Sequence, residues 1–589
     1  MRAPLLIFIA ALAVLPLLPT PEFWITLANY IGLSAIIALG LVLLTGVGGM
    51  TSFGQAAFAG IGAYASAYLN THYGLSPWLG LLAGLVITAL AALALGGITM
   101  RLSGHYLPLG TIAWGLSLFY LFGNLEFLGK HDGINGIAPI TIAGIDLASG
   151  RAMYGLIWAT VLAAAIGLQN LLDSRPGRAM RALNGNALMA EAMGVPTAWM
   201  KIVCFVVAAL LACISGWLYA HLQRAVNPTP FGLNAGIEAL FMAVVGGAGY
   251  VWGALLGAAI LTVLKDQLQS LLPALLGSTG NFEIIVFGVM MVLLLQRARD
   301  GVWPMLRGLV RQHAIDPPLA APALAVRARP LAGTLLLQLQ QVRKQFGGLL
   351  AVQDMTFELR AGEILGLIGP NGAGKSTLFN LITGVLRLSS GQIRFGSATD
   401  AQRIDGLPAR AIVACGIART FQHVRLIASM TVLDNVVLGA YLRGRRGVLR
   451  SILRANRVEE TALRWHALQQ LERVGLAHLA AHDAGSLALG QQRLLEIARA
   501  LCCDPVVLLL DEPAAGLRHQ EKVALAALLQ QLRTEGLSVL LVEHDMEFVM
   551  NLTDRLVVME FGRCIASGLP SEIQNNLAVR AAYLGGVDE

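Results

Sequence analysis

The stretch "GEILGLIGPNGAGKSTLFNLITG", Gly362–Gly384, decides the fold of the C-terminal half of the chain. An apolar strand, Ile364–Ile368, leads directly into a glycine-rich loop, and a helix is expected to begin near Lys375. Strand, loop and helix in this order are the context that a phosphate-binding P-loop requires. The glycines let backbone N–H groups surround phosphate oxygens, and the helix adds the positive end of its dipole. We therefore predict an α/β nucleotide-binding domain.

The loop and the first helical turn supply the predicted phosphate ligands. Lys375 would neutralise the charge of the β- and γ-phosphates, and Ser376 would ligate magnesium. The predicted nucleotide-binding residues here are Gly369, Pro370, Asn371, Gly372, Ala373, Gly374, Lys375, Ser376 and Thr377.

Two further apolar strands end in titratable side chains. The strand Val506–Leu510, in "PVVLLLDEPAAGL", ends in Asp511 and Glu512. Such fully apolar strands suit a parallel sheet that is covered on both faces. Asp511 is placed to hold the magnesium shell, and Glu512 to polarise the attacking water. The strand in "LSVLLVEHD" delivers His544, which reaches the γ-phosphate if this strand lies beside the other two.

The N-terminal half has the composition of a membrane protein. The chain is 56% hydrophobic and 13% charged, whereas soluble domains carry about 25% charged residues. Long apolar runs fill residues 1–300, and ordinary charge density returns near residue 335. We predict an all-α polytopic membrane domain of about ten helices (1–300), a linker (301–334) and a P-loop ATP-binding domain (335–589). The linker contains "DPPLAAPALAVRARP", which favours an extended tether.

A membrane helix needs roughly twenty apolar residues. An alternative interpretation of the first apolar run is a signal peptide that begins at Arg2. Most basic residues at span ends fall on one side, so the positive-inside rule puts both termini in the cytoplasm. The remaining basic residues are scattered, which argues against a nucleic-acid partner. The candidate spans are 3–20, 25–45, 53–70, 76–99, 105–124, 153–172, 201–222, 235–250, 251–266 and 281–297.

Three loops and four charges remain in this half. Thr45–Tyr64 is rich in Gly, Ser and Thr, and either lines a solute path or packs helices together. Gly129–Ile140 either receives a partner protein or only connects spans. Ser174–Val195 has an amphipathic helical pattern, and a helix of this kind either lies on the membrane or docks into a soluble partner. Charges at Glu238, Lys265, Asp266 and Glu283 are expected near span ends, with no acid–base pair inside the membrane.

Residues 335–589 resemble the ATP-binding domain of an ABC transporter. Phe346, before "GGLLAV", matches the aromatic residue that stacks on adenine, and Gln422, in "ARTFQHVRL", matches the glutamine that contacts magnesium. Leu487–Gln491 stands where the signature loop belongs. The resemblance implies three sets of residues: Glu512, His544 and Gln422 as catalytic; Ser376, Gln422 and Asp511 as metal ligands; and Ala488, Gly490 and Gln491 as contacts to the ATP of a partner domain.

The subfamily is indicated by further segments. "RTFQHVRL", "LALGQQRLLEIARAL", "DEPAAGL", "VEHDM" and the terminal "AAYLG" resemble the ATPase of the branched-chain amino acid importers. "TSFGQAAFAGIGAY", "DGINGI", "GWLYA" and "VVGGAGYVWGALLGA" resemble one of their two permease subunits. The resemblance implies a natural fusion of these subunits in the bacterial inner membrane, with the ATPase domain in the cytoplasm.

The same resemblance implies the activity and its participants. ATP hydrolysis, with ATP and Mg²⁺ as cofactors, would drive the import of branched-chain amino acids. The implied partners are a second permease subunit, a second ATP-binding subunit and a periplasmic solute-binding protein, together with membrane lipid and a small-molecule solute. A homodimer of this chain is the alternative assembly.

Alternatives and departures stay open at this point. Similar importers carry urea, short amides or aromatic acids. An exporter half-transporter has six long spans that reach far into the cytoplasm, unlike the short spans here. An ATPase acting on nucleic acid would require a basic surface.

The sequence departs from the family pattern at several positions. Ala488 and Leu489 replace the Ser and Gly of the general signature, and Arg518 is unusual in its loop. Within the loop Ser174–Val195, residues Asn184–Ala187 replace a stretch that is usually more charged. Whether this loop forms ion pairs with an ATPase is therefore an open question.

Overall fold

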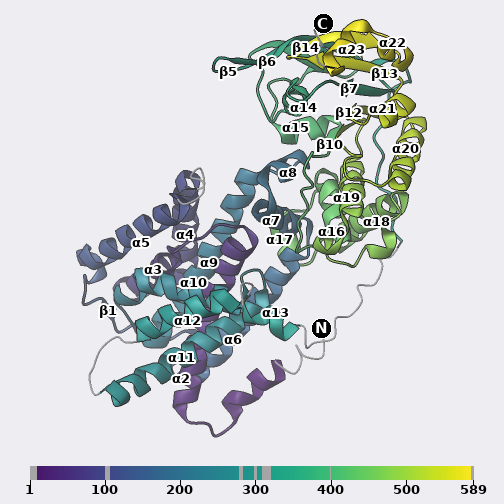
Figure 1. Ribbon diagram of the computed structural model, residues 1–589. Helices are drawn as coiled ribbons and strands as arrows, with labels where there is room; N and C mark the ends of the chain where they lie inside the picture. Colours follow the sequence, from purple (N-terminus) through teal and green to yellow (C-terminus); the bar gives the residue numbers. More distant parts are fainter. Residues whose placement is uncertain are drawn as a thin grey trace. The chain divides into compact units, whose positions relative to one another are not determined.

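The computed structural model describes residues 9–99, 106–276, 283–297, 301–307, 320–397 and 400–584 (Figure 1). Residues 1–8, which hold part of the first predicted span, lie outside the described residues. So do Arg101 and Arg299, two of the basic residues at the ends of predicted spans. The chain forms two compact units. Unit 1 comprises residues 1–173, 198–313 and 451–454, and unit 2 comprises residues 174–197, 314–450 and 455–589.

Unit 1 is a bundle of apolar helices. In hydrocarbon a helix satisfies its own backbone N–H and C=O groups, so apolar sequences of this length fold as helices. Six described helices are long and apolar enough to cross a membrane, and Leu233–Gly247 is a shorter apolar one. The predicted polytopic class is confirmed, and the count of ten spans is only approximate. The helices are α2 (Glu22–Leu41), which continues as the π-helix η2 (Val42–Val47), α3 (Gln55–Tyr73), α4 (Pro77–Thr99), α5 (Tyr106–Asn124), α6 (Gly150–Leu172), α9 (Thr197–Gln223), α10 (Leu233–Gly247), α11 (Val251–Leu276), α12 (Glu283–Arg297) and α13 (Val302–Arg307).

The glycine-rich segment Thr45–Tyr64 packs helices tightly. A Cβ atom added to Gly62 would lie 2.2 Å from the carbonyl oxygen of Cys213 in α9. One added to Gly236 in α10 would lie 2.1 Å from the carbonyl oxygen of Phe53. Real Cβ atoms do not come so close, so only glycine permits these backbone approaches. The contacts favour the helix-packing interpretation of this segment.

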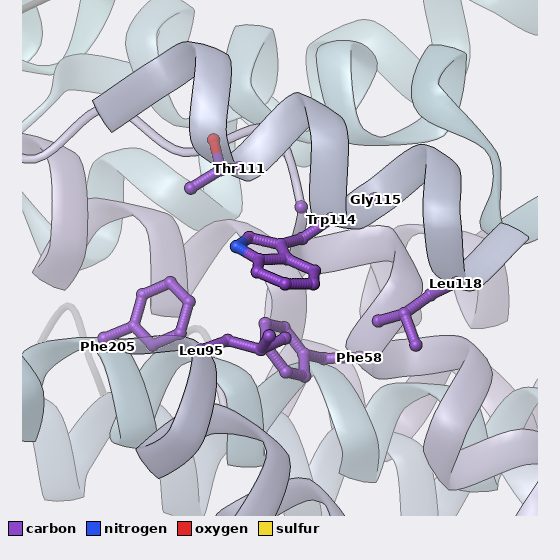
Figure 2. A pocket seen from close by; sticks show the side chains of 8 residues that line it. Phe58, Leu95, Thr111, Trp114, Gly115, Leu118 and Phe205 are labelled. Carbon is purple, nitrogen blue, oxygen red and sulfur yellow. The ribbon is translucent and has the colours of Figure 1, made fainter. Parts of the chain in front are cut away.

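A small apolar cavity lies beside the break between η2 and α3 (Figure 2). Its volume is about 10 Å³, which has room for no more than one water molecule. The cavity is therefore too small to hold a solute in this conformation. Its lining residues are Gly54, Phe58, Leu95, Thr111, Trp114, Gly115, Leu118 and Phe205.

One expectation about the membrane half is wrong. No acid–base pair is expected there from the sequence, yet Lys265 Nζ lies 2.8 Å from Glu238 Oε1. The pair joins two different helices, α10 and α11, and the sequence of each helix does not show which charge of the other lies opposite.

A six-stranded sheet forms the centre of unit 2. Its strand order is β10-β11-β12-β7-β13-β14, and neighbouring strands are parallel except for β13 and β14. The parallel order brings the carboxyl ends of β7, β11 and β12 to one edge. The strands are β7 (Ile364–Ile368), β10 (Ile417–Arg419), β11 (Val507–Asp511), β12 (Ser538–Val542), β13 (Arg555–Glu560) and β14 (Arg563–Gly568).

A four-stranded antiparallel sheet, in the order β6-β5-β8-β9, shares the core with this central sheet. Its strands are β5 (Leu335–Phe346), β6 (Leu349–Arg360), β8 (Ser390–Phe395) and β9 (Gln402–Arg403). The unit also contains the helices α7 (Arg175–Gly185), α8 (Ala187–Ala192), α14 (Lys375–Ile382), α15 (Ala409–Cys415), α16 (Val432–Gly439), α18 (Arg457–Arg473), α19 (Leu489–Leu501), α20 (His519–Thr534), α21 (Met546–Leu552), α22 (Pro570–Gln574) and α23 (Leu577–Leu584). The short helix α17 (Val448–Ile452) begins in unit 2 and ends in unit 1. The α/β class predicted for this half is confirmed.

Candidate nucleotide site

The glycine-rich loop follows β7 and ends at α14, as predicted. Gly374 has φ +100° and stands at the N-cap of α14, which begins at Lys375. Gly369 has φ +155°, and a Cβ atom there would lie 2.0 Å from the carbonyl oxygen of Met559. Both positions exclude other residues, so the loop keeps its backbone N–H groups at the start of the helix, where phosphate binds.

Lys375 folds back over this loop. Its Nζ donates to the carbonyl oxygens of Gly369 at 2.8 Å and Pro370 at 3.0 Å. Burial lowers the pKa of Lys375, and the carboxylates of Glu512 and Asp511 oppose this shift. A half-buried ammonium that donates to neutral carbonyls is suited to exchange them for phosphate oxygens.

Asp511 ends β11 with a carboxylate that is only 3% exposed. Burial raises the pKa of this carboxyl, while Arg419 lowers it. Its Oδ1 atom has no hydrogen-bond partner among the described residues. Buried carboxylate oxygens are normally paired, and oxygen ligands are what Mg²⁺ prefers. The residues present therefore fit a magnesium ion.

Glu512, Gln422 and His544 meet at the same sheet edge. Gln422 Nε2 donates to Glu512 Oε1 at 3.2 Å, and His544 Nδ1 lies 3.9 Å from Glu512 Oε2. Glu512 has φ +50°, an uncommon conformation that costs of order 1–3 kcal/mol and often marks functional sites. His544 is 61% exposed. The structure thus brings together the three predicted catalytic residues, whose roles stay predictions.

Phe346 ends β5, in the hairpin that leads to β6. A Cβ atom on Gly374 would lie 2.4 Å from the carbonyl oxygen of Ala351, so β6 packs against the glycine-rich loop. The Phe346 ring is covered on one face by Lys344 Nζ, 4.8 Å from the ring centre. The hairpin therefore holds an exposed aromatic ring near the loop, and its contact with adenine stays a prediction.

The predicted signature residues form the start of α19. Ala488 is the N-cap, with φ −64° and ψ 155°. Gln491 Oε1 accepts the Ala488 N–H at 3.1 Å, which is half of a capping box; a methyl group cannot accept the reciprocal bond. A Cβ atom on Gly490 would lie 2.8 Å from Glu521 Oε1 of α20. The side chain of Leu489 is 53% exposed and lies against Gly516. These contacts are with the Gly516–α20 segment and not with residues 369–377.

A buried ion pair that the sequence argument missed joins this helix to the Gln422 segment. Arg499 Nη2 lies 3.0 Å from Glu496 Oε1, and each side chain is 1% exposed. Glu496 Oε1 accepts the Arg425 N–H at 2.9 Å, and Arg499 Nη1 donates to the Arg425 carbonyl at 2.7 Å. The available signal was the pair of opposite charges three residues apart inside the apolar run "LLEIARAL".

The loop Ser174–Val195 belongs to unit 2 and docks there through charged groups. Arg178 is 1% exposed, and its Nη2 donates to Glu460 Oε2 at 2.7 Å. The Arg175 N–H donates to Glu460 Oε1 at 2.5 Å. The open question about ion pairs is thereby answered: Arg178 supplies one, from the turn before Asn184–Ala187.

Asp434 extends this network. Its Oδ1 lies 2.9 Å from Arg464 Nη2 and 4.0 Å from Arg178 Nη1. Burial raises the pKa of Asp434, but the charges of Arg464 and Arg178 lower it by more. The pKa of Asp434 therefore lies below that of an ordinary aspartate. The carboxylate therefore stays ionised beside the docked loop.

Comparisons with known proteins agree with these features. The family described as "Branched-chain amino acid transport system / permease component" matches residues 23–295. The family "ABC transporter" matches residues 352–515, and "Branched-chain amino acid ATP-binding cassette transporter" matches residues 563–589.

Individual relatives match less than half of the chain but nearly the whole of their own length. The high-affinity branched-chain amino acid transport ATP-binding protein LivG of Salmonella typhimurium is 43% identical over 42% of this chain and 98% of its own length. BraF of Pseudomonas aeruginosa, with the same description, is 41% identical over 42% of this chain and 98% of its own length. A crystal structure of a nucleotide-free ATP-binding cassette from an ABC transporter is 31% identical over 43% of this chain and 99% of its own, with a TM-score of 0.38.

Proposed function

The chain belongs to the branched-chain amino acid transporters of the ABC class, and we propose that it imports branched-chain amino acids across the bacterial inner membrane. It is a membrane protein with a soluble ATPase domain that couples ATP hydrolysis to transport within a multi-subunit transporter. In the proposal, one chain supplies a permease (1–300) and an ATPase (335–589), joined by the linker 301–334.

The remaining subunits follow from what one chain provides. A second permease, a second ATP-binding subunit and a periplasmic solute-binding protein complete the proposed complex, and a second copy of this chain is the alternative source of the first two. ATP would bind between the P-loop of one ATPase domain and residues Ala488–Gln491 of the other. This arrangement is supported by the place of Gly490, which lies beside Glu521 of α20 and not beside the P-loop residues 369–377 of its own domain.

The chemistry is assigned to the cluster at the sheet edge. Lys375 neutralises phosphate charge, Glu512 orients and polarises the attacking water, and His544 contacts the γ-phosphate. Ser376, Asp511 and Gln422 would hold Mg²⁺, which neutralises charge on the phosphates when bound. Phosphoryl transfer relies on positioning and electrostatics, and the Gln422–Glu512 hydrogen bond keeps the carboxylate aimed.

The observation that carries the proposal is the docked loop. Residues between α6 and α9 of the permease belong to unit 2, where Arg178 and Glu460 form a buried ion pair. A shift of the ATPase that moves α16 or α18 therefore moves the loop with it. ATP drives transport by binding more tightly to one of two conformations, and the loop supplies the connection.

Substitutions at the nucleotide site test the function. In proteoliposomes that contain the complete transporter, Lys375→Ala and Glu512→Gln should each lower ATP-driven leucine uptake and ATP hydrolysis by about 100-fold or more, as expected when a charge-stabilising group is lost. Lys130→Ala, which removes an exposed lysine paired with Glu126, is the control. Wild-type hydrolysis by Glu512→Gln would mean that another group polarises the water.

A solute panel tests the substrate. Stimulation of ATP hydrolysis by leucine, isoleucine and valine is expected, and urea, short amides and aromatic acids should stimulate weakly. The reverse ranking would replace the proposed substrate and leave ATP-driven import in place.

A further inference from the structure

Two opposite charges pair between neighbouring helices of the membrane unit. Lys265 Nζ in α11 donates to both carboxylate oxygens of Glu238 in α10, each at 2.8 Å. One ammonium bridging both oxygens is a strong, charge-assisted contact.

The pair lies well inside its helices. Glu238 is five residues from the start of α10 (Leu233–Gly247), about 8 Å at 1.5 Å per residue. Lys265 is six residues from the end of the candidate span Val251–Leu271, about 9 Å by the same rise. Snorkelling carries a long charged side chain to the membrane surface, whereas the Lys265 ammonium is held by Glu238 of the neighbouring helix.

The two side chains remain partly uncovered in this chain. Lys265 is 35% exposed and Glu238 is 34% exposed. Charges at membrane depth are expensive, face a bundle interior or a water-filled cavity, and mark solute and ion pathways. Contact with lipid would therefore be unfavourable, and this face of α10 and α11 needs a polar neighbour.

A third polar group lies on the same helix as Lys265. Thr262 precedes Lys265 by one helical turn, so the two share a helix face. Its Oγ1 is buried and has no hydrogen-bond partner among the described residues. A buried hydroxyl without a partner is costly, and a ligand that reaches it would recover that cost.

We propose that Glu238, Lys265 and Thr262 form a binding point for a zwitterionic α-amino acid in the membrane unit; the inference rests on the proposed import function and specifies its solute class. The solute carboxylate forms an ion pair with Lys265 and accepts a hydrogen bond from the Thr262 hydroxyl. The solute ammonium forms an ion pair with Glu238. Each protein charge exchanges one partner for an equivalent one, so no charge is left uncompensated during the exchange.

This exchange selects by charge. A neutral solute such as urea replaces neither ionic contact. An aromatic acid pairs with Lys265 but leaves Glu238 alone in a low-dielectric setting, which is strongly unfavourable. The site therefore favours amino acids over both alternative solute classes.

Uptake of labelled leucine by the complete transporter in proteoliposomes tests the site. Glu238→Gln and Lys265→Met should each lower kcat/KM for uptake by about tenfold or more, the range expected for a lost bond to a charged group. Thr262→Val, which keeps the shape and removes only an unpaired hydroxyl, should raise KM by about threefold to tenfold. Thr262→Ser should restore the wild-type value. An unchanged KM in Thr262→Val would overturn the role of the hydroxyl.

The double variant Glu238→Gln/Lys265→Met separates binding from structure. It leaves no unpaired charge, so a purely structural pair predicts wild-type uptake, whereas the proposed site predicts uptake still reduced about tenfold. Glu126→Gln/Lys130→Met removes an exposed pair in the segment that follows α5 and is the matched control. Wild-type uptake by the Glu238→Gln/Lys265→Met variant would overturn the inference.

The two levels of the proposal fail differently. If wild-type complex imports leucine, and Lys375→Ala abolishes import, the function stands whatever the Glu238 and Lys265 variants do. If wild-type complex imports urea but not leucine, both the solute assignment and the binding point are overturned.

Discussion

Ala488 illustrates how one atom alters a functional loop. Gln491 Oε1 already accepts the Ala488 N–H, but the methyl side chain leaves the first N–H groups of α19 without a side-chain acceptor. Those N–H groups are the ones proposed to face the γ-phosphate of a partner domain. In the proposed site the loop would therefore bind the phosphate through backbone donors and the helix dipole, a contribution of roughly 0.3–2 kcal/mol.

Ala488→Ser tests this interpretation. The hydroxyl completes the capping box, so the free energy of unfolding should rise by about 0.5–2 kcal/mol, and ATP hydrolysis should stay intact or increase. Thermal unfolding and ATPase assays measure the two effects. A large loss of activity would show that the loop needs alanine for packing.

Asp511 shows a conflict between stability and function. Burial disfavours its carboxylate and raises its pKa, so the charge costs stability at neutral pH and the cost falls as the pH drops through the pKa of the folded state. Asp511→Asn should raise the free energy of unfolding by about 0.5–2 kcal/mol at pH 7 and should abolish hydrolysis. The gain should shrink as the pH falls through the pKa of the folded state. Unfolding measured across a series of pH values from neutral to acid checks this.

Asp405 is the matched control with the opposite sign. Burial raises its pKa, but hydrogen bonds from Arg403 and from the Ile393 N–H outweigh this and lower it. Asp405→Asn should therefore lower stability at pH 7, and the loss should disappear as the pH falls through the pKa of the folded state. A gain in both variants would contradict the assignment of these shifts.

At the scale of elements, one carboxylate makes the shortest ionic contact with α7. Glu460 accepts from both the Arg178 side chain and the Arg175 N–H. Its loss leaves the buried Arg178 guanidinium with Asp434 at 4.0 Å as a more distant ionic partner, at a cost of up to about 3–5 kcal/mol. The adjacent Glu459 accepts instead from the N–H groups of Arg445 and Arg446. Neighbouring carboxylates thus serve different segments.

Glu460→Gln should uncouple the two activities. We expect leucine uptake to fall by about tenfold or more, because a fixed loop geometry is lost, and ATP hydrolysis to lose its stimulation by solute. Glu459→Gln is the control and should keep solute stimulation. Equal effects of the two substitutions would argue against a specific role of the docked loop. Parallel uptake and ATPase measurements on both variants decide this.

At the scale of the whole molecule, the linker is more than a free tether. Residues 320–331 have no regular secondary structure, as expected for a Pro- and Ala-rich segment, but they are attached to the ATPase. The Arg327 N–H donates to Asp504 Oδ2 at 2.6 Å, Arg329 Nη2 lies 3.5 Å from Asp504 Oδ1, and Arg443 donates to the Ala325 carbonyl. Asp504 follows α19 and precedes β11.

Asp504→Asn should loosen this attachment. Asparagine tolerates the positive φ of 53° at this position, so the change removes charge without strain. A loss of about 1 kcal/mol corresponds to a roughly fivefold faster cleavage of the linker by a protease. Limited proteolysis measures the rate, with the exposed Asp400→Asn as the control. An unchanged rate would mean that backbone packing alone holds the linker.

Local patterns in the sequence determined much of this protein. The P-loop, the two acids at the end of β11 and the histidine after β12 were predicted because strand, loop and helix follow one another within a few residues. The division into an apolar half and an α/β half was predicted for the same reason, since composition differs between long segments. Neither inference required knowledge of which distant residues meet.

Tertiary structure alone decided the long-range pairs. The bond between Gln422 and Glu512, the ion pair of Arg178 with Glu460, and the pair of Lys265 with Glu238 each join residues far apart in the chain. Periodicity shows which face of a helix is apolar, but not which charge on another helix will lie opposite. Burial then makes such a pair specific, because an unpaired charge inside protein or membrane is too costly to keep.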